Sequence, residues 1–108
     1  MVEREAYLNN VFGSLADPIR RDMLQRLINA QYTVSQLAEN YSISFAAVAK
    51  HLNVLQKAQL VVKQRRGKEQ VVSIAPTALE DASKYLAQYE ALWSQRFSAL
   101  DDILKEDV

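Results

Sequence analysis

Residues 44–74 read SFAAVAKHLNVLQKAQLVVKQRRGKEQVVSI, and this stretch decides the fold. Ser44 suits the N-cap of a helix that we expect from Phe45 to about Ala58. One face of this helix is apolar and should be buried; it consists of Val48, Leu52 and Leu55. The opposite face carries small and basic side chains, namely Ala46, Lys50, Asn53 and Lys57. The pattern predicts a helix with a buried side and a basic, exposed side.

The end of the same stretch changes to β-branched composition. Residues 60–63 and 71–74 are rich in Val and Ile, which favour strands. Arg65, Arg66, Gly67 and Lys68 lie between them. The sequence therefore predicts a β-hairpin with a basic tip.

Three shorter helices are predicted before Ser44. Asp17 and Pro18 suit the N-cap and first position of a helix that runs to about Ala30. Thr33 and Gln36 form a capping-box pattern that opens a two-turn helix, with Val34, Leu37, Ala38 and Tyr41 on one face.

A helix at the N-terminus is predicted from apolar residues at helical spacing, which are Tyr7, Leu8, Val11 and Phe12. We expect it to be closed near Gly13 by a glycine C-cap.

Pro76 is expected to open a last helix, because Pro suits the first helical position. No Gly or Pro follows it, so we expect the helix to extend over about residues 76–106. Its apolar residues recur every seven positions, as they do in helices that pair with one another. About 28 helical residues would span about 42 Å, which is more than a small domain covers alone. The predicted dimer interface consists of Tyr7, Leu8, Val11, Phe12, Leu86, Tyr89, Trp93, Phe97 and Leu100.

The composition narrows the class of protein. A length of 108 residues, with 49% hydrophobic and 24% charged residues, predicts one globular domain over residues 1–108. The absence of Cys excludes disulfides and thiolate metal sites. No apolar run approaches the roughly 20 residues that span a bilayer, so we expect a cytoplasmic protein without a membrane partner. One His and two Gly offer no acid–base pair or phosphate loop, so we predict neither an enzyme nor a cofactor.

The net charge of zero results from cancellation between segments. Residues 1–32 are neutral, whereas residues 33–74 hold six basic and two acidic residues, a balance of plus four. Residues 75–108 hold three basic and seven acidic residues, a balance of minus four. A cationic middle segment indicates a nucleic-acid partner.

Taken together, these elements predict a mainly α-helical fold with a small β-hairpin. Their order, four helices, a hairpin and a last helix, is that of a winged helix-turn-helix, which we expect to be dimeric. In that architecture the fourth helix enters the DNA major groove, and the hairpin tip, or wing, contacts the backbone or minor groove. The predicted DNA-binding residues are Ser44, Phe45, Ala46, Ala47, Lys50, His51, Asn53, Lys57, Arg65, Arg66 and Lys68.

Four segments resemble the ArsR-type winged-helix repressors. Residues 15–20 (LADPIR) and 48–55 (VAKHLNVL) resemble the family's opening segment and recognition-helix signature, and residues 58–61 and 66–68 follow in the expected places. The resemblance implies a homodimeric repressor of a bacterial or archaeal cytoplasm that binds a pseudo-palindromic promoter operator. It also implies release from double-stranded DNA by a metal ion or another effector.

Several residues depart from the family pattern. Thr33 and Ser35 stand where arsenic-sensing members carry a Cys-x-Cys pair, and the last segment contains no His for a zinc site. We therefore predict no metal site. Ala47 and Ala49 stand where hydroxyl residues are common, so contacts to thymine methyl groups and DNA shape should matter more than hydrogen bonds.

Two alternatives stay open at this point. The aromatic last helix would also suit a winged-helix module that binds another protein. Gathering six of thirteen cations into the fourth helix and the hairpin favours DNA instead. For His51, a half-buried packing role or a phosphate contact is favoured over metal binding.

Overall fold

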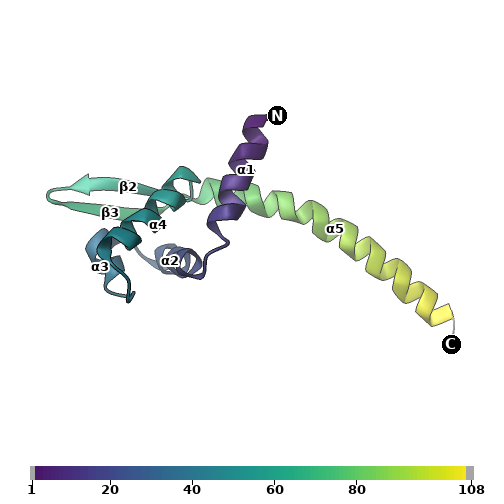
Figure 1. Cartoon of the computed structure of the whole chain (residues 1–108). Helices are drawn as coiled ribbons and strands as arrows, with labels where there is room; N and C mark the ends of the chain where they lie inside the picture. Colours follow the sequence, from purple (N-terminus) through teal and green to yellow (C-terminus); the bar gives the residue numbers. More distant parts are fainter. Residues whose placement is uncertain (1, 107–108) are drawn as a thin grey trace.

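The computed structural model describes residues 2–106, and the side chains of residues 3–105 (Figure 1). Residues 1, 107 and 108 lie outside the described part, including Asp107 of the acidic C-terminal segment. The elements, in order, are α1 (Val2–Ser14), α2 (Pro18–Asn29), β1 (Tyr32–Thr33), α3 (Val34–Ala38), α4 (Phe45–Lys57), β2 (Val61–Arg66), β3 (Glu69–Ile74) and α5 (Pro76–Glu106).

The three predicted helix N-caps are confirmed. The Asp17 carboxylate accepts hydrogen bonds from the backbone N–H groups of Ile19 and Arg20 at 2.8 and 3.2 Å. Thr33 and Gln36 form the reciprocal capping box. The Ser44 hydroxyl accepts from the Ala47 N–H at 3.1 Å, so α4 begins at the predicted residue.

The predicted glycine C-cap at Gly13 is wrong. Helix α1 continues through Gly13 to Ser14, and Gly67 is the one glycine with a positive φ in the described chain. The buried Ser14 hydroxyl instead donates a hydrogen bond to the Val11 carbonyl at 2.7 Å. The carbonyls of Gly13 and Ser14 accept from the Arg20 guanidinium, so side chains rather than left-handed backbone satisfy this helix end.

Helix α3 is shorter than the two turns predicted. It ends at Ala38 because the backbone tightens there: the N–H groups of Asn40 and Tyr41 bond to carbonyls only three residues back. Tyr41 still packs against the core from the turn that follows.

The hairpin is confirmed, and it belongs to a three-stranded antiparallel sheet in the order β1-β3-β2. Strand β1 was not predicted, because its two residues pair with partners far away in sequence, Tyr32 with Val72 and Thr33 with Val71. Gly67 has a φ of +62° at the hairpin turn, a conformation that glycine adopts without steric cost.

Helix α4 ends in a hydrogen-bonding pattern that local sequence signals do not predict. The Leu60 N–H bonds to the Leu55 carbonyl and the Gln59 N–H to the Gln56 carbonyl, which is a Schellman motif. The motif requires a left-handed residue, and Gln59 adopts it with a φ of +63°. The chain thereby turns directly from α4 into β2.

The core lies between α1, α2, α4, the sheet and the first turns of α5. Its buried residues are Val11, Met23, Leu24, Leu27, Leu37, Val48, Leu52, Leu55, Ala58, Leu60, Val61, Val72, Ala78 and Ala82. Two predicted interface residues need correction, because Leu8 and Val11 are buried within their own chain and are not free for a partner. Tyr7 and Phe12 are half-buried against the same core.

Helix α5 is continuous from Pro76 to Glu106 and projects away from the helical body, opposite the hairpin (Figure 1). The radius of gyration is 18.8 Å, against about 13 Å for a compact chain of this length. No helix in the described range is long and apolar enough to cross a membrane. The arrangement of α3, α4 and the β2–β3 hairpin is a winged helix-turn-helix, as predicted.

Candidate nucleic-acid interface

The outer face of α4 is basic and open, whereas its inner face is sealed. Val48, Leu52 and Leu55 are completely buried. The predicted contact residues Ala46, Lys50, Asn53 and Lys57 are all exposed. A shallow groove of about 460 Å³ runs along this face beside Lys50, Asn53 and Lys57. Of the remaining predicted residues on this helix, Ala47 and His51 are half-buried, while Ser44 and Phe45 are exposed at its start.

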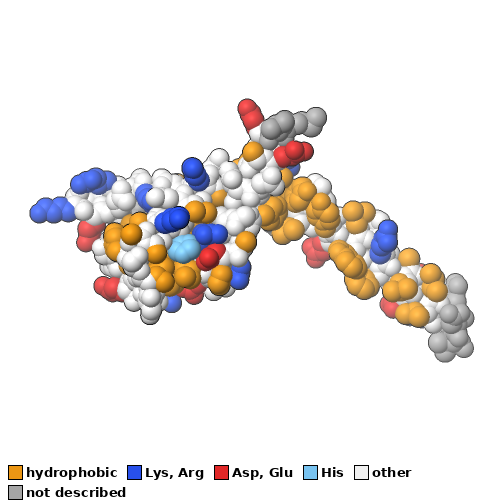
Figure 2. Space-filling model, viewed as in Figure 1, with side chains coloured by type: hydrophobic (Ala, Val, Ile, Leu, Met, Phe, Trp, Pro, Cys, Tyr) orange, Lys and Arg blue, Asp and Glu red, His pale blue; other side chains and the backbone are white. Residues whose placement is uncertain are grey.

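The wing presents three cations at its end. Arg65 and Arg66 are the last residues of β2 rather than part of a loop, and Lys68 lies in the turn. All three are exposed, and the Arg65 Nε donates to the Gly67 carbonyl at 3.3 Å. Figure 2 shows Lys and Arg side chains at the free end of the hairpin, on the side of the molecule far from α5. We call the part of the chain from α1 to β3 (residues 2–74) the head. The predicted basic tip is therefore exposed and projects from the head.

A side-chain hydrogen bond joins α4 to the wing. Lys63 on β2 donates from Nζ to the Asn53 Oδ1 at 2.6 Å. Partial burial lowers the pKa of Lys63, because desolvation disfavours its charged form. The bond orients the Asn53 amide toward β2 and uses one of the two lone pairs of its acceptor oxygen. Sequence reasoning placed Lys63 in the hairpin but did not foresee this contact.

A second bond holds α4 to the N-terminal half of the chain. The Arg20 guanidinium lies 3.1 Å from the His51 Nδ1, and its Nε donates to the Ser14 carbonyl at 2.7 Å. A guanidinium only donates, so Nδ1 accepts in this contact and Nε2 carries the ring proton. One side chain thus joins the end of α1, the start of α2 and the middle of α4.

Asp17 supports the same junction. Partial burial opposes ionisation of its carboxyl, but hydrogen bonds from two backbone N–H groups and the positive charge of nearby His51 and Arg20 together outweigh that effect and lower its pKa. These contacts account for the Asp and Arg of the LADPIR segment as structural residues. His51 is half-buried, which is compatible with the packing role, one of the two roles that the sequence favours over metal binding.

A polar network fixes the turn before α4. The Tyr41 hydroxyl donates to the Asp22 carboxylate at 2.6 Å, and Arg26 Nε donates to the same oxygen at 2.8 Å. These two hydrogen bonds lower the pKa of Asp22, while burial and the adjacent carboxylate raise the pKa of Tyr41. The network therefore anchors the α3–α4 turn to α2.

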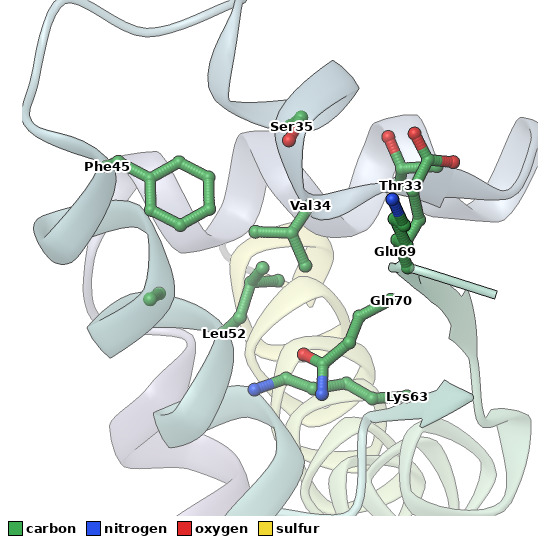
Figure 3. A pocket seen from close by; sticks show the side chains of 10 residues that line it. Thr33, Val34, Ser35, Phe45, Leu52, Lys63, Glu69 and Gln70 are labelled. Carbon is green, nitrogen blue, oxygen red and sulfur yellow. The ribbon is translucent and has the colours of Figure 1, made fainter. Parts of the chain in front are cut away.

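A cleft of about 230 Å³ separates α3 and α4 from the wing (Figure 3). Val34, Leu52 and Phe45 form its apolar wall, with Lys63 and Gln70 reaching in from the strands. Thr33 and Ser35 also line it. Within the described residues, no three His, Cys, Asp or Glu side chains gather into a group able to hold a metal ion.

The distal part of α5 leaves a long apolar stripe uncovered. The exposed large side chains are Leu86, Tyr89, Leu92, Trp93, Phe97, Leu100, Ile103 and Leu104, each more than half exposed. Trp93 and Phe97 stack with ring centroids 5.0 Å apart. Figure 2 shows these hydrophobic side chains along the length of the helix.

The proximal part of α5 is held by α1 of the same chain. The Tyr7 hydroxyl donates to Asp81 at 2.7 Å, which raises the pKa of Tyr7. The rings of Phe12 and Tyr85 lie 5.8 Å apart. The predicted contact between the two terminal helices is therefore present within one chain.

Comparison with known proteins agrees with this geometry. Residues 17–63 match the family model described as bacterial regulatory protein, arsR family. The chain is 32% identical over 82 residues to the transcriptional repressor SdpR of Bacillus subtilis, covering 76% of this chain and 91% of that protein.

Two solved structures are similar over most of the chain. An ArsR-like transcriptional regulator from Rhodococcus sp. RHA1 superposes with a TM-score of 0.76 and 33% identity, covering 94% of this chain and 95% of the other. A homodimeric winged helix-turn-helix DNA-binding domain from Mycobacterium bovis has a TM-score of 0.66 and 21% identity, over 89% of this chain and 86% of the other. The chain belongs to the ArsR family of bacterial regulatory proteins and is a transcriptional regulator with a winged helix-turn-helix DNA-binding domain.

Proposed function

We propose that this regulator is a homodimeric repressor that binds a pseudo-palindromic promoter operator. The observation that carries the proposal is the joint exposure of Lys50 and Lys57 on α4 and of Arg65, Arg66 and Lys68 on the wing. Phosphate contacts from such side chains provide affinity and set the orientation of the protein on the duplex.

In this proposal the outer face of α4 lies in the major groove, which is about 12 Å wide and admits one helix. Ala46 and Ala47 allow close approach because their side chains are small. The wing reaches the neighbouring backbone or minor groove through its three terminal cations. His51 contributes through its Nε2–H, which the bond from Arg20 leaves free to donate to a phosphate.

The second subunit is proposed to pack along distal α5. The stripe from Leu86 to Leu104 is too long and too apolar to stay in water, since large uncovered apolar patches on soluble proteins mark interaction sites. The homodimeric mycobacterial domain of similar fold supports this arrangement. A two-fold dimer would present two α4 helices to half-sites about 34 Å apart.

The test is binding of the full chain to its own promoter DNA, measured by fluorescence anisotropy as salt is varied. We expect a sequence-specific complex whose logarithmic affinity falls linearly with logarithmic salt concentration. Lys50→Ala combined with Arg66→Ala should weaken binding and reduce the slope by about 0.9 for each phosphate that the variant no longer neutralises.

A matched control is the pair Lys84→Ala and Lys105→Ala, which removes the same charge from exposed positions on α5. It should leave the slope unchanged, and both double variants should keep the mass of the dimer. Absence of any sequence-specific complex would favour the protein-interaction module instead. Loss of the dimer in the Lys50/Arg66 variant would show that the faces were misassigned.

A further inference from the structure

Three polar side chains at the start and in the middle of α4 each have one acceptor atom engaged by a donor of the same chain. The Ser44 hydroxyl accepts from the Ala47 N–H, and the His51 Nδ1 faces the Arg20 guanidinium. The Asn53 Oδ1 accepts from Lys63 at 2.6 Å. Reading an adenine by a bidentate Asn uses the amide oxygen and the amide nitrogen together, and in Asn53 the oxygen already has Lys63 as one of its two possible donors.

The surface that remains beside them is apolar. Phe45, Ala46 and Ala49 are spaced i, i+1 and i+4, so they share one side of the first two helical turns. Phe45 is 56% exposed, although it is a large aromatic residue at the start of the helix. Phe45 and Ala49 also line the cleft between α4 and the wing, and Figure 3 shows the Phe45 ring at its border. Lys50 adjoins this patch as a flexible cation.

An apolar patch can distinguish bases in one way. In the major groove the base edges present hydrogen-bonding groups, with a single exception, the 5-methyl group of thymine. Contact of alanine methyl groups and a phenyl ring with that methyl group excludes water and so stabilises the complex. The same contact with an unmethylated pyrimidine buries less apolar surface and stabilises the complex less.

We propose that this regulator reads its operator through the 5-methyl groups of pyrimidines, which contact Phe45, Ala46 and Ala49, while Lys50 and the wing supply affinity. The proposal rests on the proposed DNA binding and adds the chemical feature that is recognised. It predicts that thymine is replaceable by 5-methylcytosine more readily than by uracil at the positions that face Phe45.

The experiment uses the full chain and an operator selected by that chain from random duplexes. Each thymine of a half-site is replaced by uracil, symmetrically in both halves, and the dissociation constants are compared. Removing one buried methyl group should weaken binding about fourfold, or about 15-fold for one methyl in each half-site. At the same position, 5-methylcytosine should bind more tightly than cytosine.

Phe45→Ala then tests which residue makes the contact. In this variant the uracil penalty should fall below twofold at the thymine that faces Phe45, so that the two changes are not additive. The control is Ile28→Ala, because Ile28 is similarly exposed (61%) but lies on α2. It should retain the full penalty.

The outcomes separate the two proposals. Sequence-specific binding without a uracil penalty at any position would overturn methyl readout and leave the proposed function intact. An equal penalty in Phe45→Ala and the native chain would overturn the assignment to Phe45. Failure of the chain to select any sequence would overturn the proposed function as well.

Discussion

Helix α4 and the distal half of α5 both carry an apolar stripe at helical spacing, yet the two stripes have opposite surroundings. Leu52 and Leu55 on α4 are completely buried, whereas Leu92 and Trp93 on α5 are 60% and 62% exposed. The head completes its core within one chain because α1, α2 and the sheet close around α4. Distal α5 has no such neighbours in the described chain, and we propose that its stripe packs against a second subunit.

Charges placed on the α5 stripe should have the largest effect. Trp93→Glu with Leu100→Glu should yield a monomer with a folded head. Operator affinity should fall by about 10² to 10⁴, because the two heads no longer bind as one unit. Sedimentation and anisotropy would measure this, with Gln95→Glu and Ser98→Glu as a control that adds equal charge off the stripe. Equal loss in the control would refute the interface.

A leucine-to-alanine pair compares the two stripes directly. Leu52→Ala should lower the free energy of unfolding by about 3 kcal/mol, since it opens a cavity in a sealed core. Leu92→Ala should cost under about 1 kcal/mol in a monomeric background, where that side chain stays in water. Urea denaturation of both variants tests this, and similar losses would mean that distal α5 packs on its own head.

The Arg20 junction should have an intermediate effect. Arg20→Ala removes hydrogen bonds to Ser14 and His51, and should cost about 2 kcal/mol of folding stability. Arg21→Ala is the matched control, because Arg21 also donates to a carbonyl, that of Leu15, but has no bond to α4. Thermal melting should separate the two. If they melt alike, the bond to His51 contributes nothing.

The smallest effect should come from Asp22 and depends on pH. Its pKa lies below the ordinary 3.8, so its contribution is present above that value and is lost as pH falls through the lower, folded pKa. Because the Asp22 side chain is 43% exposed, solvent screening keeps this below about 1 kcal/mol.

Asp22→Asn should therefore lower the melting temperature slightly at pH 7. The difference from the native chain should shrink as the pH is lowered below 3.8, where the native carboxylate is also protonated. A difference that is constant from pH 7 to pH 3 would contradict an electrostatic origin.

Local signals in the sequence were sufficient for the order of the helices, for three of their N-caps and for the wing. Asp17, Thr33 and Ser44 cap the helices that follow them because each acts on backbone groups two or three residues away. The periodicity of α4 identified its buried face for the same reason. The basic wing tip could be predicted because a short run of charged residues lies between two segments rich in Val and Ile, which form the strands.

Contacts between distant residues were not accessible in the same way. Strand β1 has two residues and exists only through its pairing with β3. The Arg20–His51 contact joins residues 31 positions apart, and no local sequence signal predicts it. The C-cap predicted at Gly13 was wrong because glycine permits a helix to end but does not require it to. Leu8 and Val11 were assigned to a partner because periodicity identifies an apolar face but not its neighbour.

The left-handed Gln59 has a consequence for engineering. A non-glycine residue in this conformation costs on the order of 1 kcal/mol, a strain that the surrounding Schellman motif sustains. Natural proteins are seldom as stable as their fold allows, and Gln59 is a position where a substitution could raise the stability of this chain. A glycine there would relieve the strain at the junction between the helix and the wing, making it a first substitution for a more heat-resistant scaffold.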